Sequence, residues 1–78
     1  MKLTLYDFNN FSEAEKGEAV FKNGTFIDDR DEGGLKVQLY RLNGFYVEVF
    51  YDPKGNKIDH FRVSNSVALL SNYIKPLS

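Results

Sequence analysis

Three side chains of this sequence could together act on a phosphate ester: Glu48, His60 and Arg62. A carboxylate and an imidazole can serve as general base and general acid, and a guanidinium can stabilise negative charge that develops on a phosphate. His60 is the only histidine of the chain, so a two-histidine metal site or acid–base pair is excluded. The chemistry therefore requires a fold that brings all three side chains to one surface.

The segments that must position these residues predict two consecutive β-hairpins. Strands are expected at Leu35–Leu42, Phe45–Tyr51 and Lys57–Val63, with turns at Asn43-Gly44 and Asp52-Pro53-Lys54-Gly55. Asp, Pro and Gly at the first, second and fourth positions of the second turn are typical of a type I turn. Glu48 would thus lie on the strand beside His60 and Arg62.

The hydrophobic pattern favours one register for the first hairpin. A three-residue loop over 42–44 would pair Leu39 with Val47, and both are apolar. A two-residue turn would pair Leu39 with Glu48 and would mix apolar and charged side chains on each face. Because a slip of one residue turns every side chain to the other face, we predict the three-residue loop, with Gly44 at positive φ in a bulge.

The second hairpin is compatible with two registers. A loop over 53–55 would pair Glu48 with His60 and Phe50 with Ile58. A slip of two residues keeps every side chain on its face and changes only the pairs. Either register puts Glu48, His60 and Arg62 on one face.

The predicted register divides the sheet into two faces of different composition. One face is apolar and should be covered by helices; it comprises Leu35, Val37, Leu39, Val47, Val49, Phe61 and Val63. The other carries Tyr40, Tyr46, Glu48, Phe50, Ile58, His60 and Arg62 and should face solvent. An exposed patch of Tyr40, Tyr46 and Phe50, rimmed by Arg62, is typical of a protein interface. The alternatives are strand propensity, cross-strand aromatic pairing, and a helix over that face.

An alternative function for the same face is nuclease-like hydrolysis. The constellation resembles guanyl-type ribonucleases, which place a carboxylate, His, Arg and Tyr on the open face of an antiparallel sheet. That resemblance implies catalytic roles for Glu48, His60 and Arg62. The same residue types are also ordinary on a half-exposed sheet surface, where replacing Glu48 would cost little.

One helix is predicted before the three hairpin strands in the sequence and one after them. Ser12 and Glu15 form a capping box before a helix over 13–22. An apolar stripe of Val67, Leu70 and Ile74 predicts a second helix of about ten residues, ending before Pro76.

Two further strands complete the expected fold. Leu3 and Leu5 alternate with polar residues and suggest a short N-terminal strand, and the segment over 25–30 suggests another. The predicted fold is a single α+β domain over residues 1–78. It is an antiparallel meander of about four strands, with an N-terminal and a C-terminal helix in a two-layer sandwich.

Composition narrows the choice of partners. The net charge of −1 argues against nucleic acid, which basic surfaces bind. The chain has no cysteine, and we expect no cofactor. Asp28, Asp29, Asp31 and Glu32 lack the spacing of a calcium loop, so we expect no metal and a solvated acidic turn. Without a signal peptide or a membrane-spanning apolar segment, the expected location is cytoplasmic.

Five segments resemble a family of small bacterial α+β proteins that has no assigned activity. They are Leu5–Asn9, Gly24–Phe26, Leu39-Tyr40, Phe45–Val49 and the tail around Tyr73. Their motifs are structural, so the resemblance implies no site residue. The function expected from the sequence is a non-enzymatic protein-binding or assembly module, whose partner is another protein or a second copy of the chain.

Overall fold

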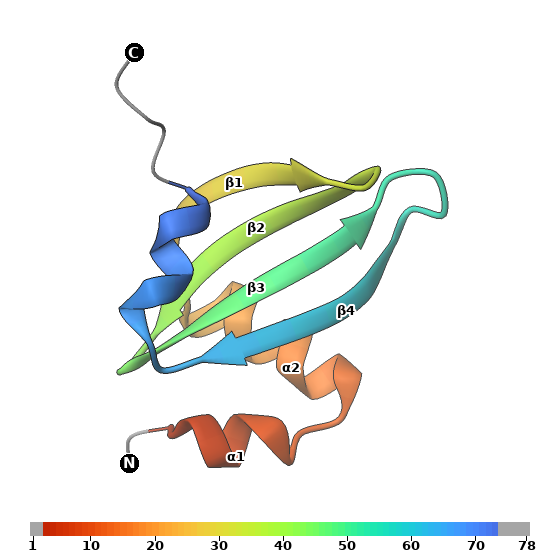
Figure 1. Cartoon of the computed structure of the whole chain (residues 1–78). Coiled ribbons are helices and arrows are strands. Elements are labelled where there is room, and N and C mark those ends of the chain that lie inside the picture. The colour runs from red at the N-terminus through yellow and green to blue at the C-terminus, as the bar shows by residue number, and fades with distance from the viewer. Residues whose placement is uncertain (1–2, 74–78) are drawn as a thin grey trace.

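The computed structural model describes residues 3–73, which form a four-stranded antiparallel sheet with helices on both faces (Figure 1). The elements are α1 (Leu5–Asn9), α2 (Glu13–Asn23), β1 (Thr25–Glu32), β2 (Leu35–Leu42), β3 (Phe45–Asp52), β4 (Lys57–Ser64) and the 3₁₀ helix η1 (Val67–Asn72). The strands follow each other in the order β1-β2-β3-β4. This confirms the predicted α+β meander with an N-terminal and a C-terminal helix. Ile74 and Pro76, used to predict the end of the last helix, lie outside the described residues.

The capping box at Ser12 forms as predicted. The Ser12 hydroxyl accepts a hydrogen bond from the backbone N–H of Glu15 at 3.2 Å, and the Glu15 carboxylate accepts one from the backbone N–H of Ser12 at 2.8 Å. These two bonds satisfy donors that the first helical turn leaves free. Helix α2 accordingly begins at Glu13.

The N-terminal strand predicted from Leu3 and Leu5 is wrong, because the segment forms α1 instead. Thr4 caps this helix, and its hydroxyl accepts from the backbone N–H of Asp7 at 3.1 Å. The Asp7 carboxylate in turn accepts from the backbone N–H of Thr4 at 3.1 Å. This second capping box outweighs two alternating leucines, a pattern too short to specify a strand.

The predicted register of the first hairpin is also wrong. β2 and β3 are joined by the two-residue turn Asn43-Gly44, so Leu42 pairs with Phe45 and Leu39 with Glu48. Asn43 rather than Gly44 has positive φ, at 55°, a conformation that asparagine tolerates. The Asn43 side-chain amide also donates to the backbone carbonyl of Leu3 at 2.9 Å and thus ties the turn to the N-terminal segment.

The second hairpin adopts the slipped register. Glu48 pairs with Arg62 and Phe50 with His60, and the register shifts between Phe50 and Tyr51. Glu48, His60 and Arg62 therefore share one face of the sheet, as both predicted registers require.

The hydrophobic core lies on the face of the sheet that α1 and α2 cover, which we call the helix face (Figure 1). Phe8 of α1 and Val20 of α2 are fully buried there against the sheet. The Phe8 ring contacts the rings of Phe45 and Phe61 with centroid distances of 5.8 and 6.2 Å. The buried strand residues of this core are Leu42, Phe45, Val47 and Val49.

The opposite face, here called the η1 face, is also buried at its centre, on β2 and β3. η1 crosses the strands on the side away from α1 and α2 (Figure 1). Val37, Leu39, Glu48 and Phe50 are all fully buried on this side. The C-terminal helix therefore does not join α2 over one apolar face, and the sheet does not have the expected solvated face around Phe50.

Candidate functional site

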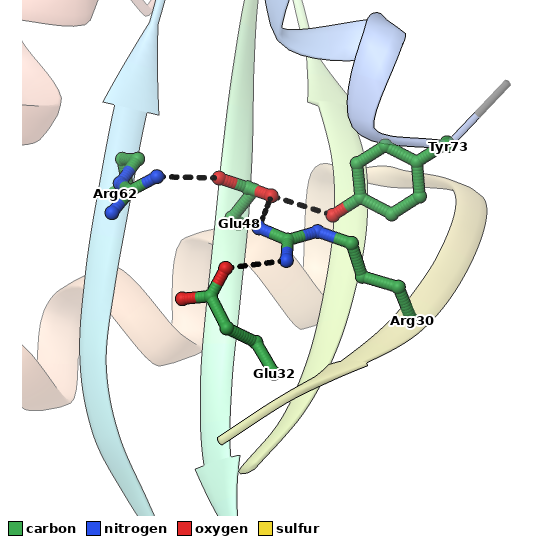
Figure 2. Close-up of polar contacts among 5 residues, drawn as sticks. All are labelled: Arg30, Glu32, Glu48, Arg62 and Tyr73. Carbon is green, nitrogen blue, oxygen red and sulfur yellow. Dashed lines mark hydrogen bonds and ion pairs between the residues drawn. The ribbon is translucent and has the colours of Figure 1, made fainter. Parts of the chain in front are cut away.

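Five side chains on the η1 face form a polar group that we call the Glu48 cluster: Arg30, Glu32, Glu48, Arg62 and Tyr73 (Figure 2). Arg30 Nη2 and the Tyr73 hydroxyl both donate to Glu48 Oε2, at 2.9 and 2.6 Å. Arg30 Nη1 donates to Glu32 Oε1 at 2.6 Å, and Arg62 Nη1 lies 3.8 Å from Glu48 Oε1. The cluster thus connects β1, β3, β4 and the residue that follows η1.

The two central charged groups of the cluster, Glu48 and Arg30, are largely removed from solvent. The Glu48 side chain is 0% exposed and that of Arg30 only 16%. Burial lowers the pKa of Arg30, but its hydrogen bonds to Glu32 and Glu48 outweigh burial and raise that pKa above its usual value. The hydrogen bond from Arg30 lowers the pKa of Glu32. Arg30 therefore stays charged, and removing its partner would leave a buried cation uncompensated.

Glu48 is closed to solvent, which disfavours a catalytic role. Its Oε2 atom is occupied by Arg30 and Tyr73, and the 3.8 Å separation from Arg62 is too long for a hydrogen bond to Oε1. Among the described residues, Glu48 Oε1 and Arg30 Nε are buried without a hydrogen-bond partner. A base that abstracts a substrate proton must come within hydrogen-bond reach of it, and this carboxylate is covered.

The remaining members of the predicted catalytic constellation lie at the edge of the cluster. The His60 ring stacks on Phe50, with a centroid distance of 4.1 Å and an interplanar angle of 16°. Its Nδ1 atom lies 2.6 Å from a carboxylate oxygen of Asp59. Arg62 lies with its guanidinium 5.3 Å from the centre of the Phe50 ring. His60 and Arg62 thus both cover Phe50, and although Arg62 also approaches the buried Glu48, the three side chains do not line an open pocket.

The four predicted binding residues do not form one exposed patch. Phe50 is fully buried, and Tyr46 is half-buried on the same face. Tyr40 points to the helix face, because the two-residue turn reverses the faces of β2. Arg62 is exposed but is engaged with Glu48 and Phe50. The predicted exposed patch therefore does not form, because Tyr40 lies on the other face and Phe50 is buried.

A different aromatic surface lies where α2 meets the edge of the sheet. Tyr40 contacts Phe21 of α2 and Phe26 of β1, with centroid distances of 5.8 and 5.6 Å and edge-to-face geometry. Phe21 is 56% exposed and Phe26 51% exposed, and neighbouring Ile27 is 41% exposed. We call Phe21, Phe26 and Tyr40 the edge aromatic cluster. Of its members, the sequence singled out only Tyr40.

A groove continues this surface across the helix face. It has a volume of about 340 Å³ and runs from β1 to β4 next to Phe21. Its other lining residues are Asp29, Lys36, Gln38, Val49, Tyr51 and Ile58. Apolar side chains form much of the groove, while Asp29 and Lys36 supply charges along it. A hollow of this composition is typical of a binding site.

The raised pKa of Tyr73 leads us to expect that the stability of the fold depends on pH. Burial and the hydrogen bond to Glu48 raise the pKa of Tyr73 above its usual 10. A raised pKa means that the folded state holds this proton more tightly than the unfolded state, so the stabilisation is complete below pH 10 and is lost as the pH rises above it. We expect urea unfolding of the wild type to show this alkaline loss, and Tyr73→Phe to reduce it. Tyr6→Phe, at an exposed position, should leave it unchanged.

An alkaline loss of equal size in the wild type and in Tyr73→Phe would contradict this prediction. Burial also raises the pKa of Tyr40, but that tyrosine is present in all three proteins. The difference between the wild type and Tyr73→Phe therefore isolates the Glu48 cluster.

Residues 3–73 show a small α+β meander with one closed polar cluster and one open aromatic surface. Comparisons with protein-family models, curated proteins and solved structures found no significant match to this chain. In the part of the chain that the structure describes, no helix is long and apolar enough to cross a membrane. The same residues contain no group of three or more His, Cys, Asp or Glu side chains arranged to hold a metal ion.

Proposed function

We propose that this chain is a non-enzymatic protein-binding module that uses the edge aromatic cluster and the adjoining groove. The observation that supports this most strongly is the exposure of Phe21 and Phe26, each more than half exposed, beside a groove of about 340 Å³. Large aromatic side chains bury much area at little entropic cost and contribute strongly to protein interfaces. The Glu48 cluster, whose central carboxylate is covered, has no part in the proposed binding.

A double substitution tests this function. Phe21→Ser/Phe26→Ser should weaken the binding of protein segments by at least about tenfold, because aromatic anchors in an interface often contribute about 2 kcal/mol or more. The probe is a randomised peptide library displayed on phage, selected on the immobilised wild-type chain. The enriched peptides are then measured by fluorescence anisotropy on each variant.

A matched control uses exposed side chains elsewhere on the molecule. Tyr6 and Val67 are 77% and 67% exposed and lie on α1 and η1. Tyr6→Ser/Val67→Ser should bind the selected peptides like the wild type. The proposal fails if the library yields no enriched peptide, or if the Phe21→Ser/Phe26→Ser variant binds as tightly as the wild type while remaining folded.

A further inference from the structure

The edge of the sheet at β1 has an outer side that no neighbouring strand of the described residues covers. β1 is the first strand in the sheet order, and seven of its eight residues are exposed. Its inner side pairs with β2, and no other strand among residues 3–73 pairs with its outer side. An edge strand of this length is a template for another extended segment unless the protein protects it.

Sheet edges are commonly protected by proline, by β-bulges and by charged side chains, above all lysine. β1 has a bulge between Phe26 and Asp28 but neither proline nor lysine. It carries four carboxylates instead, at Asp28, Asp29, Asp31 and Glu32. Asp31 pairs with Lys36 at 2.8 Å, and Glu32 pairs with Arg30 at 2.6 Å. No ion pair within the described residues involves Asp28 or Asp29. Asp28 Oδ1 accepts a hydrogen bond from the backbone N–H of Asp29 at 2.7 Å, which occupies that backbone donor. Since no cation among the described residues forms an ion pair with either acid, both can still attract a basic partner.

Charge distinguishes between the possible occupants of this edge. In an antiparallel pair of two complete copies of β1, Asp28 of each copy would lie opposite Asp29 of the other, and like charges opposite each other are destabilising. A basic segment would instead face complementary charge along Asp28 and Asp29. The bulge between Phe26 and Asp28 separates this acidic half from the apolar start of the strand.

The two faces of β1 define which side chains would meet such a segment. Phe26 pairs with Tyr40 and Asp29 with Gln38, so both belong to the helix face. Asp28 pairs with Leu39 and belongs to the η1 face. A bound strand would thus meet aromatic side chains at one end of β1 and a carboxylate on each face at the other.

We propose that β1 binds an extended basic segment of a partner protein as a fifth strand of the sheet. An apolar or aromatic side chain of the segment packs on Phe26 and Tyr40, and lysine or arginine side chains lie next to Asp28 and Asp29. This inference rests on the proposed function, since it specifies the partner of the same surface.

The probe is an end-capped octapeptide of four consecutive lysines followed by threonine, valine, tyrosine and valine, so that successive lysines present a charge to each face of the sheet. Its reversed sequence tests the parallel orientation, and a version with glutamate in place of lysine tests charge. We expect one of the lysine peptides to bind, the glutamate peptide to bind at least about tenfold more weakly, and amide NMR shifts to change along 25–32 rather than along 57–64.

Two variants with the same change in charge identify the acids that matter. Asp28→Asn/Asp29→Asn should weaken binding of the lysine peptide by about tenfold. Glu13→Gln/Glu18→Gln, which removes two exposed carboxylates from α2, should change the affinity by less than about twofold. Shifts confined to β4 or to the groove, equal binding of the two charge versions, or equal effects of the two variants would each overturn the proposal.

The two proposals fail in different ways. If library-selected peptides bind through Phe21 and Phe26 but neither lysine peptide binds, the chain is a binding module and the basic-strand proposal is wrong. If neither probe binds, both are wrong. Sedimentation of the chain without peptide adds a third outcome, because a dimer would point to a second copy as the occupant of the edge and would overturn the basic-segment proposal.

Discussion

Replacing Glu48 by alanine is expected to destabilise the fold by about 3–5 kcal/mol, the range found when one partner of a buried ion pair is removed. The substitution leaves the buried guanidinium of Arg30 with only Glu32 and removes the acceptor for Tyr73. A domain of this size has a total stability of about 4–12 kcal/mol at roughly 0.05–0.15 kcal/mol per residue. Urea unfolding followed by circular dichroism measures the loss. The sequence alone predicted a small effect at Glu48.

A double substitution separates the ion pair from simple loss of volume. Arg30→Met/Glu48→Leu removes both charges and retains apolar bulk, and such replacements of buried pairs are often neutral or stabilising. We expect this variant to be more stable than Glu48→Ala, although Arg30→Met alone should also be destabilising. If the double variant were less stable than Glu48→Ala, the uncompensated charge of Arg30 could not be the source of the loss.

The parts of the fold that depend on local signals were predictable. The capping box of Ser12 and Glu15 involves residues three apart, and it sets the start of α2. The turn residues Asn43 and Gly44 likewise marked the end of one strand and the start of the next. The Thr4–Asp7 capping box had the same kind of local signal, and the alternation of two leucines concealed it.

The register could not be derived from a pattern of two faces, because β2 and β3 have buried residues on both faces of the sheet. Val47 and Val49 are buried on the helix face, while Val37 and Leu39 are buried on the η1 face. Alternation of apolar and polar residues along a strand predicts which side chains face the core only when the other face of the sheet is solvated. With apolar residues on both sides, the apolar pairing that the pattern favoured was one residue out of register.

The burial of Glu48 could not be predicted, because it depends on partners far away in the sequence. Its hydrogen bonds reach Arg30, 18 residues before it, and Tyr73, 25 residues after it. A carboxylate in a strand is normally exposed, and only those two partners make its burial tolerable. One available signal was Arg30 itself, the single cation of β1 among four carboxylates. Phe21 and Phe26 were missed because their exposure depends on how far α2 covers the sheet.

Phe50→Ala is expected to cost about 3–5 kcal/mol, as for other fully buried phenylalanines. The ring is 0% exposed, stacks on His60 and lies beneath the guanidinium of Arg62 at 5.3 Å. Its loss removes apolar burial and leaves a cavity on the η1 face between β2 and β4. Thermal and urea unfolding should show this as a lower melting temperature and a lower urea midpoint.

Two comparisons separate a core role for Phe50 from the binding role predicted from the sequence. His60→Ala removes only the exposed ring that covers Phe50 and should cost less than about 1 kcal/mol, as surface changes usually do. At low temperature, where Phe50→Ala remains folded, it should bind library-selected peptides as the wild type does, since the proposed binding surface is formed by Phe21 and Phe26. If Phe50→Ala were as stable as the wild type and lost peptide binding, Phe50 would belong to the binding surface, and the burial that Arg30, His60 and Arg62 provide would not hold in solution.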